Sequence, residues 1–267
     1  MKPVMRYFQS TLLSRRQLNR DNFLLYFSDL QVASEAQPGQ FVMIAADLET
    51  DCPYPLLMRP FSVFGVEQRT GQFSVLVKTV GLGTRKMAGF PPGSPVPTIG
   101  LLGNQFVVRE GRTVLMVAGG VGIAPFYLMA QQLVPRQIRP VLFYGARSRE
   151  GLVTLEDFVK LGVEVHAVTE DGSYGSQGLV TAVVGDYLAQ HDNCDLFACG
   201  PTPMLAAASD LAVRAGVPLQ VSVECYMACG FGACFGCAVE TKTGFRLACQ
   251  HGPVFDGLQM IWERGHV

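Results

Sequence analysis

Four cysteines near the C-terminal end of the chain have the spacing of metal ligands. They follow the pattern C-x4-C-x2-C-x11-C and are Cys229, Cys234, Cys237 and Cys249. Thiolates in the order C-x4-C-x2-C…C are typical ligands of plant-type [2Fe–2S] clusters. Glycines at positions 230 and 232 let the backbone wrap a compact inorganic core and point N–H groups at sulfur. The spacing therefore predicts a [2Fe–2S] cluster.

Two other interpretations of these cysteines remain open. A structural zinc site also uses four thiolates, but zinc sites favour C-x2-C pairs, and the x4 gap with glycines suits a cluster better. The cysteines could also be unrelated buried thiols. Residues 239–247 predict a hairpin that turns near Lys242-Thr243-Gly244 and returns the chain so that Cys249 completes the set. Cys225 lies outside the spacing, and we expect it to be a packed thiol.

A glycine-rich turn earlier in the chain has the character of a phosphate site. Residues 113–118 predict a buried strand, Gly119-Gly120-Val121-Gly122 follows it, and residues 126–133 predict a helix. Exposed N–H groups and the positive end of a helix favour an anion such as pyrophosphate. The spacing is not G-x-G-x-x-G, so this is not the ordinary Rossmann fingerprint, and the turn alone could be structural.

A second turn strengthens this interpretation. Cys199-Gly200-Pro201-Thr202-Pro203-Met204 follows a predicted strand over residues 195–198 and opens another predicted helix. Ligands of parallel sheets bind at the carboxyl ends of the strands. A free cysteine is more often a small buried apolar residue, so Cys199 alone does not identify a site.

The pattern of predicted elements divides the chain into three parts. Residues 1–108 contain short apolar or alternating runs separated by glycine and proline turns, which predicts a small antiparallel β-barrel. In residues 109–218 strands alternate with helices, which predicts an α/β domain with a parallel sheet. Residues 219–267 carry the cysteine cluster, and we expect a small β-rich domain.

The stretch Arg59-Pro60-Phe61-Ser62, together with the two turns, resembles the ferredoxin–NADP reductase superfamily, in which a flavin barrel precedes a pyridine-nucleotide domain. In that superfamily the arginine of R-P-x-S meets the flavin pyrophosphate and the serine lies near the isoalloxazine. The resemblance implies that the Cys199 thiol is a catalytic residue beside the nicotinamide. It also implies a second flavin-phosphate contact at Gly83-Thr84. The FAD and nucleotide positions it implies are Arg59, Pro60, Phe61, Ser62, Leu76, Val77, Lys78, Gly83, Thr84, Gly119, Gly120, Gly122, Cys199, Gly200, Pro201 and Met204.

More specific motifs resemble one family within this superfamily, the electron-transfer subunits of dihydroorotate dehydrogenase B. They are M-A-C-G-x-G-A-C-x-x-C over residues 227–237 and Gly252-Pro253-Val254-Phe255; Leu102-Gly103-Asn104-x-Phe106 also fits, with Gln105 where the family pattern has glycine. The resemblance implies FAD, a [2Fe–2S] cluster and NAD as cofactors. It also implies a heterotetramer with an FMN-containing catalytic subunit that oxidises dihydroorotate in pyrimidine biosynthesis.

Two further functions remain alternatives. The chain could be a NAD(P)H reductase subunit of another flavin–iron–sulfur complex, such as a ferredoxin-dependent transhydrogenase or a sulfite reductase, and the identity of the partner would distinguish this case. It could also be a zinc-binding structural or regulatory module with a degenerate nucleotide fold. A colourless preparation would favour the module, because flavin and cluster absorb visible light.

Two acidic residues predict which nucleotide is used. Glu170 and Asp171 follow a predicted strand over residues 163–169, where NADP-using relatives resemble one another in carrying Ser-Arg for the 2′-phosphate. Carboxylates at this position should repel a phosphate dianion and accept ribose hydroxyls. NAD is therefore expected, although Arg147 and Arg149 on a nearby loop argue for caution.

The composition limits the remaining possibilities. Charged residues make up 16% of the chain, and the net charge is −1, whereas about a quarter is typical of soluble domains. This excludes the basic field of a nucleic-acid-binding protein, and the missing charge predicts surface covered by a partner or by cofactors. The longest apolar stretch, residues 114–130, is broken by three glycines and Pro125, so we expect no membrane span.

The N-terminal ten residues contain no apolar core of signal-peptide length. Clustered thiols suit a reducing compartment, so we expect a cytoplasmic protein. Residues 227–239 contain no charged side chain and include Phe231 and Phe235. An uncharged surface with aromatic anchors is typical of a stable protein interface, although uncharged cluster loops also occur because thiolate sulfur is shielded from water.

Overall fold

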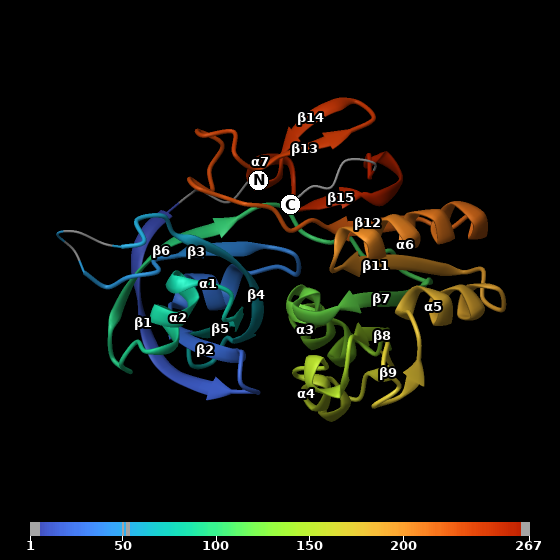
Figure 1. Ribbon diagram of the computed structural model, residues 1–267, viewed down its shortest axis with the longest axis horizontal. Coiled ribbons are helices and arrows are strands. Elements are labelled where there is room, and N and C mark those ends of the chain that lie inside the picture. The colour runs from blue at the N-terminus through green and yellow to red at the C-terminus, as the bar shows by residue number, and fades with distance from the viewer. Residues whose placement is uncertain (1–5, 50, 52–53, 263–267) are drawn as a thin grey trace.

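The computed structural model describes residues 6–49, 51 and 54–262. These residues form an antiparallel barrel, a seven-stranded sheet covered by helices, and a small lobe with a two-stranded hairpin (Figure 1). The predicted fold class, a barrel followed by a parallel-sheet domain and a small β-rich domain, is confirmed.

The barrel closes through six antiparallel strands in the order β1-β2-β5-β4-β3-β6. Inward side chains such as Phe23, Leu25 and Phe27 fill its interior, whereas Leu24 and Leu76 point outward and join the core of the sheet domain. β2 and β5 are therefore apolar on both faces, because one face borders the barrel interior and the other borders the core of the sheet domain. The elements are β1 (Arg6–Gln17), β2 (Asn22–Ser28), α1 (Leu30–Glu35), β3 (Phe41–Ile44), β4 (Arg59–Glu67), β5 (Gln72–Lys78), α2 (Leu82–Ala88) and β6 (Pro95–Leu102).

The large sheet has the order β10-β9-β8-β7-β11-β12-β15, and only β15 runs antiparallel to its neighbour. Its strands are β7 (Thr113–Gly119), β8 (Val141–Ala146), β9 (Glu164–Thr169), β10 (Ser176–Gln177), β11 (Cys194–Cys199), β12 (Leu219–Ser222) and β15 (Val254–Asp256). Its helices are α3 (Ala124–Leu133), α4 (Leu155–Lys160), α5 (Val180–Leu188) and α6 (Thr202–Ala215), with 3-10 turns η1 (Gly120–Ile123), η2 (Val134–Arg136) and η3 (Arg149–Gly151).

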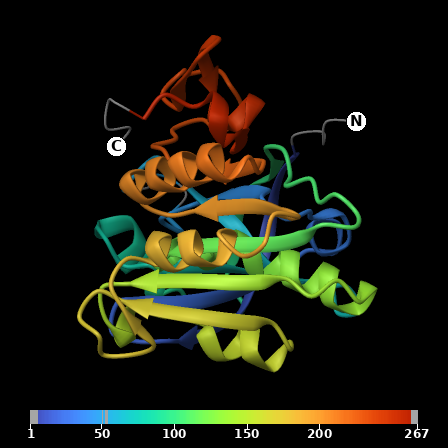
Figure 2. The same ribbon diagram turned by 90° about the vertical axis from the view of Figure 1, so that its right-hand side faces the viewer.

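Alternate residues of β7 serve the two faces of this sheet. Leu115 and Val117 pack in the core that includes residues of α5 and α6, while Met116 and Ala118 pack in the core that includes residues of α3 and α4. Figure 2 shows α5 and α6 in front of the sheet and the small lobe above its edge. The helix predicted over residues 126–133 begins at Ala124, directly after the 3-10 turn η1, because proline suits the first turn of a helix and Pro125 stands there.

The small lobe begins and ends in the large sheet. The chain leaves β12, forms the cysteine loop, the hairpin β13 (Ala238–Thr241) and β14 (Gly244–Leu247), and α7 (Ala248–His251), and returns through β15 to the turn η4 (Gly257–Gln259). The predicted hairpin with its turn at residues 242–243 is confirmed.

Asn104 fastens this lobe to the end of the barrel. Its Nδ2 donates to the carbonyls of His251 (3.1 Å) and Val254 (2.8 Å), and its Oδ1 accepts from the Val254 N–H at 2.9 Å. A Cβ on Gly103 would lie 2.5 Å from Pro253 Cδ. The two sequence motifs around residues 102–106 and 252–255 therefore contact one another.

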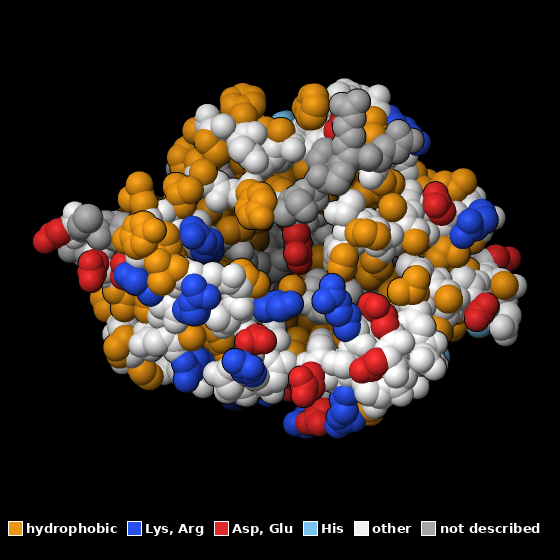
Figure 3. Space-filling view, in the orientation of Figure 1, with side chains coloured by type: hydrophobic (Ala, Val, Ile, Leu, Met, Phe, Trp, Pro, Cys, Tyr) orange, Lys and Arg blue, Asp and Glu red, His pale blue; other side chains and the backbone are white. Residues whose placement is uncertain are grey.

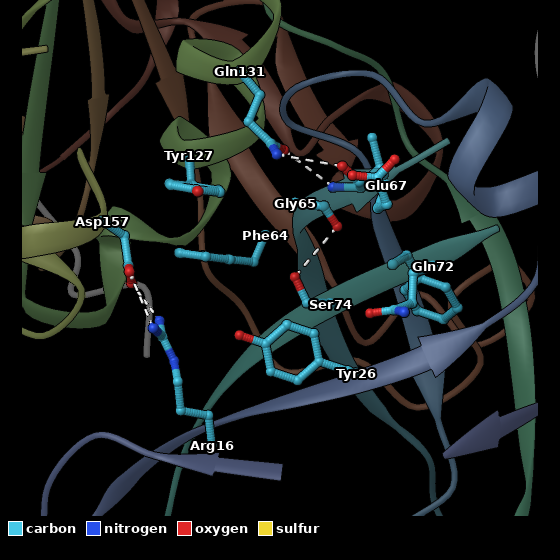
Figure 4. A pocket seen from close by; sticks show the side chains of 12 residues that line it. Arg16, Tyr26, Phe64, Gly65, Glu67, Gln72, Ser74, Tyr127, Gln131 and Asp157 are labelled. Carbon is cyan, nitrogen blue, oxygen red and sulfur yellow. Dashed lines mark hydrogen bonds and ion pairs between the residues drawn. The ribbon is translucent and has the colours of Figure 1, made fainter. Parts of the chain in front are cut away.

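A second junction joins the barrel to the sheet domain (Figure 4). The rings of Phe64 and Tyr127 stack with centroids 4.5 Å apart, Gln131 exchanges two hydrogen bonds with the backbone of Val66, and Arg16 pairs with Asp157. These contacts surround a small cavity of about 230 Å³. None of its lining residues is one that the sequence assigned to a cofactor. The cavity is therefore part of the junction.

The linker after the barrel carries a further ion-pair network. Asp195, 3% exposed at the start of β11, accepts from Arg109 Nε at 2.7 Å and Nη2 at 2.5 Å and also pairs with Arg112. A buried carboxylate is tolerated where such donors satisfy it. Across the described ranges, no helix has both the length and the apolar character needed to cross a bilayer.

Replacing Asp195 with Asn keeps the side-chain shape and removes the charge that holds both arginines. We expect the free energy of unfolding to fall by about 2 kcal/mol, the size expected for lost hydrogen bonds to a charged group, as measured by urea denaturation. Asp157→Asn removes a carboxylate that is 15% exposed, against 4% for Asp195, and that pairs with one arginine. It is the control and should cost less than about 1 kcal/mol.

The difference between the wild type and Asp195→Asn should depend on pH. Burial by itself raises the pKa of Asp195, but hydrogen bonds from Arg109 and Arg112 outweigh it, and the net pKa lies below the ordinary value. Such a group stabilises the fold above its unfolded pKa of about 3.9 and loses that contribution as the pH falls through the folded pKa. The difference should be complete at neutral pH and shrink below about pH 4; a difference that does not change with pH would contradict this assignment.

Candidate functional site

A cavity of about 980 Å³ lies where the barrel, the large sheet and the chain leading to the cysteine loop meet. Figure 3 shows this face of the molecule, where Lys and Arg side chains form a band below a more apolar upper part. The cavity opens at the carboxyl ends of β11 and β12, the edge at which parallel sheets bind ligands. Its volume is in the upper part of the range of small-molecule sites.

The barrel wall of this cavity carries most of the residues predicted for the flavin. Arg59, Pro60, Phe61 and Ser62 line it along β4, and Leu76, Lys78 and Thr84 add to the same wall. Val77 is fully buried and packs inside the barrel instead, because side chains alternate across a strand. The wall thus offers apolar surface for a flat ring beside cationic groups.

Gly83 and Arg59 form a cradle suited to a phosphate. A Cβ on Gly83 would lie 3.0 Å from Ala46 Cβ and 3.4 Å from Arg59 Nη2, so glycine leaves the backbone open beside the guanidinium. Arg59 Nη1 donates to the Leu57 carbonyl at 2.6 Å, which holds the guanidinium in place. Thr84 Oγ1 accepts from the Val80 and Gly81 N–H groups, so its hydroxyl stabilises the loop beside the cradle. These features fit the pyrophosphate of FAD.

The two glycine turns of the sheet domain, residues 119–122 and 199–204, contact one another at the opposite wall. We call these two turns together the glycine shelf. A Cβ on Gly122 would lie 2.3 Å from the Cys199 carbonyl oxygen, and a Cβ on Gly119 would lie 2.7 Å from Pro201 Cδ and 2.8 Å from Met204 Sδ. Val121, Gly200 and Pro201 line the cavity, whereas the predicted contacts Gly119, Gly120, Gly122 and Met204 are not among its lining residues. The sequence presented two separate turns, and the structure brings them into contact because β7 and β11 are neighbours in the sheet.

Cys199 lies just beneath this shelf. It is 2% exposed, and its burial, together with the nearby Glu224, raises the pKa of its thiol well above the ordinary value, although a hydrogen bond with Ser222 opposes this. The thiol is therefore neutral at physiological pH. Its neighbour Gly200, rather than Cys199 itself, lines the cavity.

Glu224 is a cavity residue that the sequence analysis missed. It follows β12, whose Ser222 pairs with Cys199 of β11, and it lines the cavity opposite Lys78 of the barrel. Surrounding protein raises the pKa of Glu224, while Lys78 opposes the shift. A lone acidic residue at the carboxyl end of a buried strand is the signal that could have identified it.

The cysteine loop gathers the predicted cluster ligands. Cys237 and Cys249 have their sulfur atoms 3.2 Å apart, and the Gly236 N–H lies 3.5 Å from Cys234 Sγ. Burial tends to raise the pKa of Cys229, but N–H groups of residues 231, 233 and 234 and a hydrogen bond with Cys234 lower it to about 7. Gly230 and Gly232 have φ values of +77° and +88°, which lets the loop turn its amides toward sulfur.

This donor set fits a [2Fe–2S] cluster, because the four thiols come from one loop and one hairpin end and are surrounded by backbone N–H groups. Among the residues that the structure describes, no three His, Cys, Asp or Glu side chains, these cysteines included, stand in a metal-binding arrangement, so the fit rests on the type and spacing of the thiols and on the contact between Cys237 and Cys249. Cys225 Sγ lies 4.0 Å from the Cys237 carbonyl oxygen, beside the loop and in the cavity wall.

Glu170 and Asp171 lie outside the cavity, at the end of β9. Asp171 Oδ1 accepts from the Ser173 N–H at 2.9 Å and from its hydroxyl at 2.6 Å, so this carboxylate stabilises its own turn, and these bonds lower its pKa. Glu170 is exposed. The Arg149 guanidinium lies over the ring of Tyr174, 4.7 Å from its centroid. This arginine, which could have favoured the 2′-phosphate of NADP, therefore has an aromatic partner within the protein.

Comparisons with known proteins agree with this arrangement. The model of the iron–sulfur cluster binding domain of dihydroorotate dehydrogenase B matches residues 224–261, and that of an oxidoreductase NAD-binding domain matches residues 116–210. The matched cluster domain contradicts the alternative of a zinc-binding module.

Curated relatives match almost the whole chain. The dihydroorotate dehydrogenase B (NAD(+)) electron transfer subunit of Bacillus caldolyticus is 35% identical over 257 residues, 94% of this chain and 97% of its own. That of Desulforamulus reducens is 32% identical over 261 residues, 96% and 98% of the two chains.

Solved structures share the fold. An NADH-dependent reduced ferredoxin-NADP oxidoreductase has a TM-score of 0.84 at 29% identity, covering 95% of this chain and 90% of its own. The ferredoxin reductase of carbazole 1,9a-dioxygenase has a TM-score of 0.68 at 21% identity, covering 81% and 69% of the two chains, and shows the fold alone.

Replacing any one of Cys229, Cys234, Cys237 or Cys249 with Ser should remove or alter the cluster, because a hydroxyl is a poor substitute for a thiolate ligand. Iron and acid-labile sulfide content and the electron paramagnetic resonance spectrum of the reduced protein measure this. Cys225→Ser is the matched control and should keep both. Loss of the cluster in the Cys225 variant, or an unchanged cluster in the other four, would contradict the ligand set.

Proposed function

The chain belongs to the family of dihydroorotate dehydrogenase B electron transfer subunits, and on this premise we propose that it passes electrons between an FMN-containing, dihydroorotate-oxidising partner chain and NAD+. It is an NAD-linked oxidoreductase subunit that uses FAD and a [2Fe–2S] cluster. We propose residues 1–108 as the FAD barrel, residues 109–218 as the NAD domain and residues 219–267 as the cluster domain. The proposed location is the cytoplasm, where reduced thiols persist.

One observation carries the proposal: the wall of the flavin cavity leads directly into the cluster loop. Residues 222–227 line the cavity, and the first cluster ligand, Cys229, follows two positions later. The Cys225 side chain contacts the backbone of Cys237. A protein that brings these two sites so close along one chain segment is built for electron exchange between them.

FAD, when bound, supplies hydride exchange with nicotinamide and single-electron exchange with the cluster. The chain's own residues bind and orient it: Arg59 and the Gly83 backbone would hold the pyrophosphate, and Pro60, Phe61 and Leu76 would contact the flat ring. The glycine shelf would hold the nucleotide pyrophosphate, and the neutral Cys199 thiol would pack below the nicotinamide ring.

Glu224 and Lys78 bring opposite charges to the cavity wall. The surrounding protein raises the pKa of Glu224, and Lys78 opposes the shift. The two side chains would therefore influence the charge that the cavity presents to a bound flavin or nucleotide.

A second candidate function rests on the similarity to the NADH-dependent reduced ferredoxin-NADP oxidoreductase. A chain of this fold could serve a different catalytic partner while keeping the same cofactors. Purification of the native complex and identification of the co-purifying chain would separate the two candidates: an FMN protein that reduces its flavin with dihydroorotate supports the first.

The cluster loop is the proposed docking surface for the partner. Phe235 is 68% exposed and Phe231 39% exposed, and the surrounding residues 227–239 carry no charge. Aromatic anchors in an uncharged surface support a stable contact, and a cluster that serves a second chain must lie close to such a surface. We propose a heterotetramer with a central dimer of catalytic chains.

We expect NADH to reduce the bound FAD with a higher kcat/KM than NADPH, because the exposed Glu170 carboxylate repels the additional 2′-phosphate. Glu170→Gln should narrow this preference by roughly fivefold, since one exposed charge pair is worth about 1 kcal/mol. Stopped-flow bleaching of the flavin with each nucleotide measures it. Glu35→Gln, on α1 of the barrel, should change nothing; a wild type that prefers NADPH would contradict the assignment.

Phe231→Asp or Phe235→Asp should weaken the complex with the catalytic chain by about tenfold or more, because each buries a charge where an aromatic anchor should pack. The dissociation constant can be measured by titrating the purified chains. Bleaching of FAD by NADH should persist, since both residues lie outside the flavin cavity. Val159→Asp, an exposed apolar residue on α4, is the matched control; unchanged affinity in the Phe variants would place the interface elsewhere.

A further inference from the structure

We propose that Gln131 of α3 is a positioning residue: it holds the nucleotide wall of the large cavity at a fixed distance from the flavin wall, and so sets the rate of hydride exchange. The proposal rests on the proposed function in one respect, that NAD(H) and FAD meet in this cavity. Gln131 itself does not line the cavity. It lies in the junction between the barrel and the sheet domain (Figure 4).

Helix α3 connects the nucleotide wall to the barrel. It begins directly after η1, which overlaps the glycine shelf, and its first residue, Ala124, lines the cavity together with Val121 of η1. One turn later, Leu128 is fully buried and belongs to the core of the barrel rather than to a core of the sheet. The helix that follows the shelf is therefore anchored in the other domain.

Strand β4 carries the flavin wall at one end and meets α3 at the other. Residues 59–62 line the cavity and pair with β3, which does not extend along β4 as far as Val66. The amide of Gln131 takes the place of a strand there. Its Oε1 accepts from the Val66 N–H at 3.1 Å, and its Nε2 donates to the Val66 carbonyl at 3.3 Å, so both backbone groups are satisfied.

The contact between α3 and β4 leaves no room for a change in spacing. A Cβ on Gly65 would lie 2.9 Å from Tyr127 Cδ1 and 3.0 Å from Gln131 Oε1. The rings of Phe64 and Tyr127 stack beside it with an angle of 3° between their planes (Figure 4). Because packed interiors transmit strain, a shift of α3 on β4 would move the glycine shelf relative to residues 59–62.

The distance between the walls matters because hydride exchange needs the reacting atoms about 3–3.5 Å apart, and a misplacement of about 1 Å can lower a rate about 100-fold. The shelf itself stays intact when α3 shifts as a unit. A role in positioning therefore predicts a lower limiting rate of flavin reduction at saturating NADH, with little change in the NADH concentration that gives half of that rate.

The test uses two variants of the FAD-loaded full-length chain that disturb the contact in different ways. Gln131→Met keeps the length of the side chain and removes both hydrogen bonds, whereas Gly65→Ala keeps the bonding groups and inserts a methyl group. In stopped-flow reduction by NADH, each should lower the limiting rate by about tenfold, with half-saturation within about twofold of the wild type. Gly65→Ala carries the test if Gln131→Met binds FAD poorly.

Gln220→Met is the matched control. Gln220 also exchanges two hydrogen bonds with the backbone of one residue, Val107, at 2.9 and 2.6 Å, but this pair joins the linker to β12 and neither residue lines the cavity. Gln220→Met should lower the urea midpoint about as much as Gln131→Met and leave the limiting rate unchanged. An equal loss of rate in both would show a general effect of stability and overturn the proposal.

Two readouts do not depend on turnover. Hydrogen exchange of the Val66 N–H, followed by mass spectrometry without nucleotide, should be faster in Gln131→Met than in the wild type. The long-wavelength charge-transfer absorbance that NAD+ gives with FAD kept reduced by dithionite should weaken in both variants, because it requires contact between the rings. Unchanged exchange, or an unchanged limiting rate and absorbance in both variants, would overturn the proposal. Wild-type FAD that NADH cannot reduce would instead contradict the proposed function.

Discussion

The hydrogen bonds of the Asn104 side chain link the end of the barrel to the cysteine lobe and to the edge of the large sheet, the three parts that border the cavity. Asn104 follows the last barrel strand, and its amide satisfies backbone groups of His251 and Val254, the residues that lead from the cysteine lobe into β15. β15 in turn pairs with β12 at the edge of the large sheet. Because one amide makes these bonds, the barrel end, the sheet edge and the lobe are held in one arrangement.

The barrel and the sheet domain behave as one packing unit for a related reason. Leu24 and Leu76 face outward from the barrel and belong to the same core as Met116 and Phe126 of the sheet domain. Separating the two would expose that shared apolar surface. The shared core therefore holds the two walls of the cavity against one another. The barrel wall can bind the flavin while the wall of the sheet domain binds the nucleotide.

One chain segment, residues 222–227, connects the cavity to the cysteine loop. These residues line the cavity proposed for the flavin, and the cysteine loop follows them directly, so Glu224 and Cys225 lie on the chain segment between the two proposed sites. Glu224 and Lys78 bring opposite charges to the cavity wall, and backbone N–H groups of the cysteine loop surround the Cys229 sulfur. The protein contributes orientation and electrostatics, and the cofactors contribute the chemistry.

The sequence by itself determined the features that short stretches of chain specify. Ligand spacing at residues 229–249, the alternation of strands and helices after residue 109, and the glycine turns are local patterns, because covalent geometry fixes which residues a loop or strand end can bring together. Family motifs added the flavin barrel. These patterns predicted the fold class and the cofactors, and nine of the residues that they assigned to cofactors line the cavity.

Only the tertiary structure decided how those stretches meet. It placed Gly122 against the Cys199 carbonyl, turned Val77 into the barrel, and brought Glu224 and Trp262 into the cavity wall. None of these follows from spacing, because each depends on a contact between residues far apart in sequence or on which face of a strand a side chain occupies. The physical reason is that a cavity wall is assembled from separate elements, and its composition is set by packing rather than by any one motif.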